Sequence, residues 1–315
     1  MLNFFITYEC NFHCDYCFVR GFGSRYPTSV SADNFSRLCE WLQKKHVYSL
    51  GILGGEPTLH PRLVPMLQAL NQAGVAPVLF TNALFPDSLR KPLAETVVNF
   101  VVNYNDPAMY TDRQHLLLEE NIAALKAMDC NVSFSRNFSK SSMRYDYILD
   151  GCERHGIQHI RYDISRPNPV YANDYFNLEE SRELTHMIVA FVRECEQRGI
   201  ETGLDCCLPL CFFSAEERDY LRQISMKFSG ICHPSLDIQS DLSVTYCIPL
   251  QDISAPDVTT FGSESALLGY FADTVRSLRT DPERTECRDC PLFGKSCQGG
   301  CLALKQKLLH REAAT

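Results

Sequence analysis

Short apolar runs alternate with amphipathic stretches from residue 2 to about residue 200, and this alternation restricts the fold more than any other feature of the chain. The apolar runs predict β-strands at 3–7, 49–53, 76–80, 99–104, 131–135 and 159–164. The stretches between them predict helices at 31–45, 62–73, 86–95, 112–128 and 141–155, followed by a longer helix at about 178–198. Strands that alternate with helices form right-handed βαβ units in a parallel sheet. The sequence therefore predicts an α/β fold whose sheet is open, closed or partly closed.

Residues that start or stop helices fall at the ends of these predicted helices. The predicted N-caps are Ser31 and Asn177, the latter with Glu180 at the third helical position, and the predicted C-terminal glycines are Gly74, Gly156 and Gly199.

The chain has 315 residues and the composition of an ordinary globular protein, with 45% hydrophobic and 22% charged residues. The net charge of −8 disfavours nucleic acid or an anionic membrane as partner. No apolar run is long enough to span a membrane, and the N-terminus lacks the features of a signal peptide. We therefore expect a cytoplasmic protein, in which the sixteen cysteines are metal ligands, catalytic thiols or core residues rather than disulfides.

Cysteines become dense after residue 205, where predicted strands become sparse. The segment 235–247 predicts a hairpin around Ser240 and Asp241, and 263–279 predicts a helix. These features predict two domains: an α/β domain at 1–204 and a small domain at 205–315 that is held together by metal.

Three cysteines follow the first predicted strand in the stretch TYECNFHCDYCF, with the spacing Cys10-x3-Cys14-x2-Cys17. A closed zinc site or an ordinary iron–sulfur cluster takes four ligands, so either a fourth ligand comes from elsewhere or one metal position stays open. The second predicted strand ends in GGEP (54–57), where adjacent glycines allow close approach of a ligand and Glu56 adds an acceptor. Both motifs follow strand ends, where α/β folds place their chemistry.

A zinc site is one interpretation of the three cysteines alone, with His13 or His60 as the fourth ligand. GGEP alone is also compatible with a simple turn.

Taken together, the loop CNFHCDYC, in which Tyr16 precedes the last cysteine, and the GGEP strand end resemble the radical S-adenosylmethionine (SAM) superfamily. The resemblance covers about residues 1–200 and implies a partial (β/α)6 TIM-like barrel, in agreement with the six predicted strands. It implies that three cysteines hold a [4Fe–4S] cluster whose fourth iron chelates SAM, and that the GGEP residues contact the SAM amino group. The residues concerned are Cys10, Cys14 and Cys17 for the cluster, and Tyr16, Gly54, Gly55 and Glu56 for SAM.

By position on the family barrel, side chains after the later strands are expected at the active-site mouth. The polar candidates for cofactor contact are Thr81, Asn82, Asn103, Asn105, Ser135 and Asn137. The charged candidates for a catalytic role are Arg136, Asp163 and Arg166. Each of them is equally compatible with a hydrogen bond at a strand end.

The C-terminal run Cys287-x2-Cys290-x6-Cys297-x3-Cys301 resembles the core of the SPASM domain, which carries two auxiliary [4Fe–4S] clusters in radical SAM enzymes. The pair Cys232-x14-Cys247 resembles the two cysteines that flank the hairpin of that domain. The resemblance implies eight auxiliary ligands: Cys206, Cys211, Cys232, Cys247, Cys287, Cys290, Cys297 and Cys301.

This region departs from the family pattern in two ways: Leu242 replaces the usual hairpin glycine, and no cysteine follows Cys301. We prefer Cys206 over Cys207 as a ligand, because adjacent cysteines rarely both reach one metal. One auxiliary cluster is an alternative, as is zinc, because paired cysteines are typical of zinc ribbons. The isolated Cys39, Cys130, Cys152 and Cys195 are predicted to be buried apolar residues.

The resemblance implies an oxidoreductase. In the family, the reduced cluster splits SAM into methionine and a 5′-deoxyadenosyl radical, and this radical abstracts a hydrogen atom from the substrate. The auxiliary clusters then accept an electron or bind the substrate. The expected substrate is a ribosomally made peptide that is crosslinked or oxidised.

Alternatives are a dehydrogenase of a carbohydrate or small molecule, and a sulfatase-maturing enzyme. The latter usually carries Asp after the hairpin cysteine, where this chain has Ile248. A multi-cluster electron carrier is the non-enzyme alternative. Because the chain begins at the first predicted strand, we expect a leader peptide to bind a separate protein or the barrel rim. The expected redox partner is an electron donor such as a flavodoxin or ferredoxin.

Overall fold

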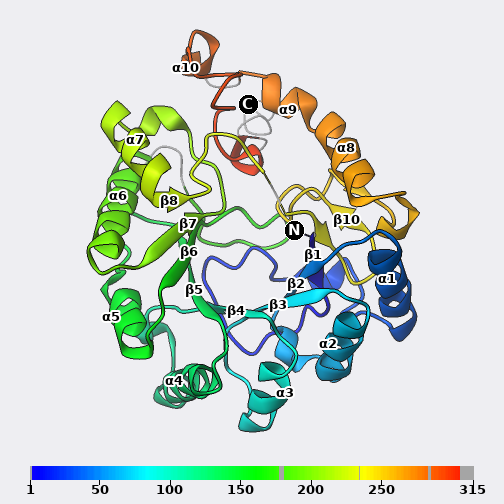
Figure 1. The fold of residues 1–315 in the computed structure, drawn as a ribbon. Coiled ribbons are helices and arrows are strands. Elements are labelled where there is room, and N and C mark those ends of the chain that lie inside the picture. Colours follow the sequence, from blue (N-terminus) through cyan, green and yellow to red (C-terminus); the bar gives the residue numbers. More distant parts are fainter. Residues whose placement is uncertain (1, 177–180, 234, 283–284, 306–315) are drawn as a thin grey trace.

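A single curved sheet organises the computed structural model, which describes residues 2–176, 181–233, 235–282 and 285–305 (Figure 1). The sheet has eleven strands in the order β11-β10-β9-β1-β2-β3-β4-β5-β6-β7-β8. Neighbouring strands are parallel from β9 to β8, and β9, β10 and β11 pair antiparallel at one edge. The predicted α/β fold and the partial barrel that the resemblance implies are therefore confirmed, and the C-terminal region extends the same sheet.

All six strands predicted from the sequence are present. The barrel strands are β1 Leu2–Phe5, β2 Ser49–Leu53, β3 Ala76–Thr81, β4 Asn99–Asn103, β5 Val132–Phe138 and β6 His159–Ile164. The further strands are β7 Glu201–Leu204, β8 Ser225–Met226, β9 Asp237–Ile238, β10 Val244–Thr245 and β11 Ser254–Ala255.

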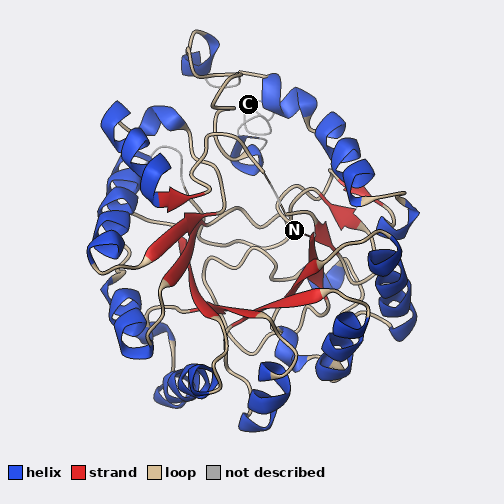
Figure 2. Ribbon diagram, viewed as in Figure 1, coloured by secondary structure: helices blue, strands red, loops and turns tan. Residues whose placement is uncertain are grey.

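Helices cover the outer face of the sheet, as Figure 2 shows. They are α1 Ala32–Lys44, α2 Leu63–Gln72, α3 Arg90–Ala94, α4 Asp112–Ala127, α5 Asp146–His155, α6 Ser181–Gln197 and α7 Ala215–Ile224. In the C-terminal region α8 spans Glu264–Thr274, α9 spans Arg276–Thr280 and α10 spans Thr285–Arg288.

The predicted helix ends are confirmed where the structure describes them. Ser31 caps α1 by accepting a hydrogen bond from the backbone N–H of Asn34. Gly74, Gly156 and Gly199 have positive φ angles after α2, α5 and α6, a conformation that glycine adopts without strain. The predicted cap Asn177 and its partner Glu180 lie outside the described residues.

The hydrophobic core continues across the predicted domain boundary at 204/205. Leu204 at the end of β7, Leu208 after it and Val244 in β10 all belong to the same buried cluster as the barrel strands. The boundary falls directly after a strand of the common sheet, so the division into two domains stays a prediction.

The predicted hairpin forms between β9 and β10, and its turn contains a strained residue. Leu242 has φ 72° and a fully buried side chain. Leu242 is the residue that replaces the usual glycine of this hairpin. Left-handed backbone costs an L-residue about 1–2 kcal/mol, which burial of the leucine side chain offsets.

The red end of the C-terminal segment lies between the two edges of the curved sheet, whereas the orange helix α8 lies on the outer side of β10 (Figure 1). Among the isolated cysteines, Cys152 and Cys195 are buried as predicted, whereas Cys39 and Cys130 are partly exposed. No helix in the described ranges has the length and apolar character needed to cross a membrane.

Candidate functional site

A cavity of about 1450 Å³ runs through the barrel. Residues near the starts of the strands, such as Asn3, Asn99 and His159, line one part of it, and residues near the strand ends, such as Asn103 and Asp163, line another. The interior of the barrel is therefore a space for ligands rather than a packed core.

Cys10, Cys14 and Cys17 all line this cavity, on the loop that follows β1. The GGEP strand end holds that loop through the backbone: Gly55 N donates to Thr7 O (2.8 Å) and Glu56 N donates to Glu9 O (2.7 Å). A Cβ on Gly55 would lie 2.3 Å from Glu9 O, and a Cβ on Gly54 would lie 2.5 Å from Thr7 O. These two glycines are therefore required by the close approach of the cysteine loop.

Glu56 also lines the cavity and joins the ends of β2 and β3. Its carboxylate is buried and accepts from Thr58 N (3.1 Å), Thr58 Oγ1 (2.7 Å), Thr81 Oγ1 (2.8 Å) and Asn82 N (2.7 Å). Burial raises the pKa of Glu56, although these hydrogen bonds oppose the shift. Among the described residues, Oε2 accepts a hydrogen bond only from Asn82 N, so it retains capacity to accept from a ligand.

A buried polar network surrounds Cys14. Asn103 Nδ2 and Asn105 Nδ2 lie 3.9 and 4.0 Å from Cys14 Sγ. Tyr16 OH bonds to both asparagine side chains, and burial raises the pKa of Tyr16 so that its phenol stays neutral. Of these four residues, Tyr16, Asn103 and Cys14 line the cavity, and Asn105 lies behind them.

The three thiols of the loop fit a metal cluster by their chemistry. Burial raises the pKa of Cys10 to about 11 and, with the Cys17 charge, that of Cys14 to about 12. A metal would displace these protons and compensate the thiolate charges. Of the two histidines proposed for zinc, His13 lines the cavity, whereas His60 Nδ1 accepts from Arg62 N (3.2 Å).

A second group of cysteines lines the same cavity and comes from distant parts of the C-terminal region: Cys206, Cys207, Cys232, Cys247 and Cys301. Within the group, the Cys206 thiol hydrogen bonds to Cys301 and the Cys207 thiol to Cys232. The bond from Cys206 lowers the pKa of Cys301 to about 7. Both adjacent cysteines therefore belong to the group, and the preference for Cys206 over Cys207 stays a prediction.

Arg166 lies between the two cysteine groups. Its guanidinium stacks over the ring of Phe18, 4.4 Å from the ring centroid, next to Cys17. The hydrogen bond to Cys301 and burial raise the pKa of Cys206, and burial raises that of Cys247; the Arg166 charge opposes both shifts. The same charge adds to the hydrogen bond from Cys206 in lowering the pKa of Cys301. Arg166 is therefore a cation that stabilises the thiolates of the second group.

Asp163 fixes this arrangement from the end of β6. Its Oδ1 accepts from Cys206 N (3.0 Å) and its Oδ2 lies 3.3 Å from Arg166 Nη2. The carboxylate is fully buried. Asp163 and Arg166 thus face the cavity as predicted, and Asp163 has a positioning role.

Arg136, the third charged candidate, does not face the barrel mouth. Its neighbours Ser135 and Asn137 line the cavity, whereas Arg136 points to the helix side of β5 and is 2% exposed. The prediction for Arg136 is wrong because successive side chains of a strand point to opposite faces of the sheet.

The remaining C-terminal cysteines lie apart from the cavity. Cys297 Sγ accepts from Gly299 N (3.4 Å), and a Cβ on Gly299 would lie 3.8 Å from Cys287 Sγ. Cys290 follows α10, and Cys211 is exposed. Pro209 and Leu210, which precede Cys211, pack against the segment 296–300.

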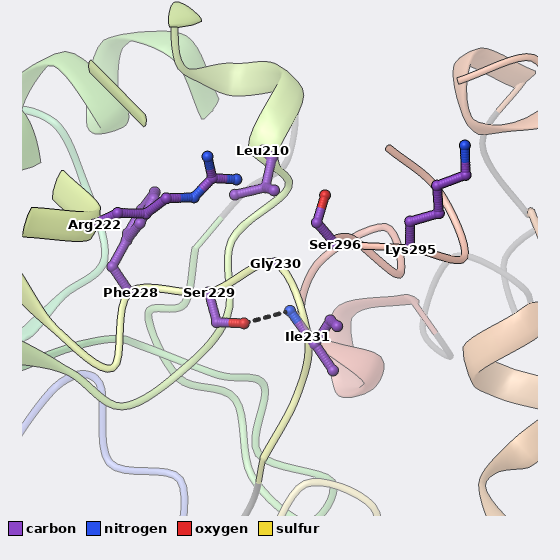
Figure 3. A pocket seen from close by; sticks show the side chains of 8 residues that line it. All are labelled: Leu210, Arg222, Phe228, Ser229, Gly230, Ile231, Lys295 and Ser296. Carbon is purple, nitrogen blue, oxygen red and sulfur yellow. Dashed lines mark hydrogen bonds between the residues drawn. The ribbon is translucent and has the colours of Figure 1, made fainter. Parts of the chain in front are cut away.

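A smaller pocket of about 310 Å³ opens next to this segment. Figure 3 shows Arg222 of α7 and Lys295 reaching it from different sides, and Ser229 Oγ accepting from Ile231 N (3.0 Å). Gly230 forms its floor, where Gly230 O accepts from Gln298 N (3.0 Å). The pocket marks the junction between the barrel and the C-terminal cysteine loop.

No three His, Cys, Asp or Glu side chains in the described ranges are placed to coordinate one ion. The cysteines of a [4Fe–4S] cluster bind different irons, so they need not converge on a single point.

One polar cluster of the cavity was not predicted. Arg161 of β6 pairs with Asp205, which also lies 3.0 Å from Lys227 Nζ, and Arg161 Nη1 donates to Ser135 Oγ (2.9 Å). Side chains alternate between the two faces of β6, so Arg161 lies on the same face as Asp163. Applied to the sequence, this alternation would have predicted that Arg161 faces the cavity.

Comparison with known proteins agrees with this site. Residues 4–131 match the model of the radical SAM superfamily. A tungsten-containing aldehyde ferredoxin oxidoreductase cofactor-modifying protein from Pyrococcus furiosus is 34% identical over 101 residues, which is 30% of this chain and 28% of that protein. The match thus spans less than a third of the curated relative.

Two solved structures share the fold over nearly the whole chain. SuiB of Streptococcus suis bound to S-adenosylmethionine has a TM-score of 0.69 at 19% identity, covering 97% of this chain and 73% of that one. anSMEcpe with bound AdoMet has a TM-score of 0.69 at 15% identity, covering 99% and 96%. Residues 4–131, which include the cysteine loop and the GGEP strand end, therefore carry a match to the radical SAM superfamily, and nearly the whole chain, including its cysteine-rich C-terminal region, shares the fold of these two structures.

Proposed function

We propose that this protein is a radical SAM oxidoreductase that removes hydrogen from a peptide held between two cysteine groups. The observation that carries the proposal is the common cavity: Cys10, Cys14 and Cys17 line it together with Cys206, Cys207, Cys232, Cys247 and Cys301. Its volume of about 1450 Å³ exceeds the roughly 300–1,000 Å³ of single-ligand sites. The cavity therefore has room for a cofactor and a substrate side chain at once.

The residues of the first group fit a [4Fe–4S] cluster and SAM. Cys10, Cys14 and Cys17 would hold the cluster, and the GGEP strand end would bind the SAM amino group through Glu56 and the backbone. With both bound, the cofactors supply abstraction of a hydrogen atom from a substrate carbon. Asn103 and Tyr16 line the adjacent wall and would orient the cofactor.

The second group fits an auxiliary cluster that would line the same cavity. The positive charge of Arg166 stabilises its thiolates, and Asp163 holds both Arg166 and the backbone of Cys206 in place. We propose a second auxiliary cluster on Cys211, Cys287, Cys290 and Cys297, because the segments that carry them pack together.

A peptide is the substrate class that we favour. SuiB has been crystallised with its precursor peptide SuiA, and anSMEcpe with the Cp18Cys peptide. Paired charges in the cavity, such as Arg161 with Asp205, offer both donors and acceptors to a peptide backbone. An external electron donor of the flavodoxin or ferredoxin class and a separate leader-binding protein complete the proposal. Sixteen cysteines that serve as metal ligands and core residues rather than disulfides would suit a reducing cytoplasm.

Anaerobic reconstitution with iron and sulfide tests the first part of the proposal. With SAM and a strong reductant, the wild type should release 5′-deoxyadenosine, measured by chromatography. Cys14→Ser should abolish the product and reduce iron content, whereas Cys39→Ser, outside the cavity on α1, should leave both unchanged. Iron bound without any 5′-deoxyadenosine would instead support an electron carrier.

Variants of the second group test the auxiliary clusters and the substrate class. Cys247→Ser should lower the iron content by about one cluster of four irons while SAM cleavage without substrate persists. Mass spectrometry of candidate peptides and sugars incubated with the holoenzyme should show loss of hydrogen from a peptide. Loss of hydrogen from a sugar alone would contradict the peptide assignment.

A further inference from the structure

Arg136 is a buried cation for which the described part of the chain provides no carboxylate within ion-pair distance. The residue is 2% exposed on the helix side of β5. Its guanidinium lies over the rings of Tyr147 and Phe138, 5.4 and 5.9 Å from the centroids. Its Nε has no hydrogen-bond partner among the residues that the structure describes, and its Nη1 donates to Asn105 Oδ1 (3.3 Å). A charge buried in this way is costly unless negative charge lies nearby.

Arginine can only donate hydrogen bonds, so it fixes which way the Asn105 amide faces. The oxygen of Asn105 must face Arg136, and its nitrogen must then face the other way, toward Cys14 Sγ at 4.0 Å and Tyr110 OH at 3.4 Å. This physical constraint settles an orientation that amide geometry alone leaves ambiguous.

The constraint passes on to the second asparagine through Tyr16. The Tyr16 hydroxyl donates its proton to Asn105 Oδ1. Its lone pair then accepts from Asn103 Nδ2 (2.9 Å), which also lies 3.9 Å from Cys14 Sγ. The two side-chain amides therefore both direct N–H groups toward one sulfur.

We propose that Arg136 is a positioning residue for the first cluster: it orients Asn105 and, through Tyr16, Asn103, so that both donate N–H···S hydrogen bonds to Cys14 and raise the cluster's reduction potential. The inference rests on the proposed function, because it requires a cluster on Cys10, Cys14 and Cys17.

The direction of the effect follows from charge. A one-electron reduction adds negative charge to the cluster and its thiolates, and hydrogen bonds to the sulfurs stabilise that charge. The buried guanidinium acts in the same direction because it is positive. Loss of Arg136 removes both contributions, so the cluster becomes harder to reduce.

An EPR-monitored redox titration of the reconstituted full-length protein without SAM measures this potential. In Arg136→Met we expect the ratio of reduced to oxidised first cluster at a given potential to fall about tenfold, which is ~59 mV for one electron. Arg136→Lys, which keeps a positive donor, should lie closer to the wild type. Tyr147→Phe is the matched control, because the Tyr147 hydroxyl has no hydrogen-bond partner in the described part of the chain and the ring remains against Arg136.

Asn105→Leu provides a second route if Arg136→Met does not fold, since it removes the amide with little change of volume. It should lower the potential in the same direction. A loaded Arg136→Met or Asn105→Leu variant with the potential of Tyr147→Phe would overturn the inference. Failure of the wild type to assemble the first cluster, read from iron content and optical absorption, would instead overturn the proposed function and the inference with it.

Discussion

Replacing Gly55 by alanine tests how closely the GGEP strand end holds the cysteine loop. The added Cβ would lie 2.3 Å from Glu9 O, 2.7 Å from Glu9 C and 2.8 Å from Tyr8 O. All three are backbone atoms, so no side chain can rotate away, and the two segments must separate by about 1 Å to reach an ordinary contact. Overpacking of this kind costs about 1–3 kcal/mol.

The separation also weakens the two hydrogen bonds that Thr7 O and Glu9 O accept from Gly55 N and Glu56 N. At about 0.5–1.5 kcal/mol each, their loss brings the expected destabilisation of Gly55→Ala to about 3 kcal/mol. Because Glu9 precedes Cys10, the shift also displaces the first cluster ligand, and misplacement of about 1 Å is enough to impair a metal site.

Urea unfolding of the metal-free protein measures the first effect, and iron content after reconstitution measures the second. Gly269→Ala is the matched control: nothing lies within 4 Å of the new Cβ, and the residue is inside helix α8. There alanine should stabilise by up to about 1 kcal/mol. If Gly55→Ala unfolds at the same urea concentration as the wild type and binds as much iron, the close approach is not what requires glycine at this position.

Three further changes have expected outcomes. Leu242→Gly removes the backbone strain at φ 72°, which costs about 1–2 kcal/mol, but it also removes a fully buried side chain that contributes about 3–5 kcal/mol. Urea unfolding should therefore show a net loss of about 2 kcal/mol in the free energy of unfolding. A variant more stable than the wild type would contradict this. Burial alone would raise the pKa of Glu119, but hydrogen bonds from His155, Tyr104 and Arg154 outweigh it and lower that pKa to about 2. The carboxylate therefore stabilises the fold fully above about pH 4.5, and this contribution of up to about 3 kcal/mol is lost as the pH falls toward 2; the unfolding free energies of the wild type and Glu119→Gln should converge over that window, and parallel curves would refute the assignment. Chelation of metal from the reconstituted protein should expose the segment 285–305 to protease before the barrel strands, because little regular structure holds it; unchanged protease resistance of that segment would count against a metal-dependent C-terminus.

Local sequence pattern was sufficient to predict the strands β1 to β6 but not the strands that extend the sheet at its two edges. β2 and β6 occupy the residues that their apolar runs indicated. β7, with the sequence ETGL, was not predicted, because it is short and contains a glycine. The two-residue strands β8 and β11 exist only through pairing with β7 and β10, and such pairing is a tertiary effect that a single-sequence pattern does not carry.

The cysteine loop and the GGEP strand end were predictable because each lies directly after a strand. Residues that lie within a strand are harder to assign, because the face to which each side chain points depends on the pleat of the strand. β5 runs to Phe138, beyond its predicted end, so Ser135, Arg136 and Asn137 lie inside the strand. They then alternate, and Arg136 alone faces the helices. Had the predicted β5 extended to Phe138, the alternation of side chains between the two faces of a strand would have placed Arg136 on the opposite face from Ser135 and Asn137.

The grouping of the C-terminal cysteines could not be read from their spacing. Cys297 and Cys301 are four residues apart and resemble one ligand run, yet Cys301 lines the barrel cavity and Cys297 lies outside it. Gly299 and Gly300 separate them with φ angles of 87° and 95°, a backbone that reverses direction as side-chain-bearing residues rarely do. A Cβ on Gly300 would lie 2.7 Å from the Pro209 ring. The two glycines thus allow one short segment to place Cys301 at the cavity and Cys297 outside it. The spacing between cysteines shows their separation along the chain but not this change of direction.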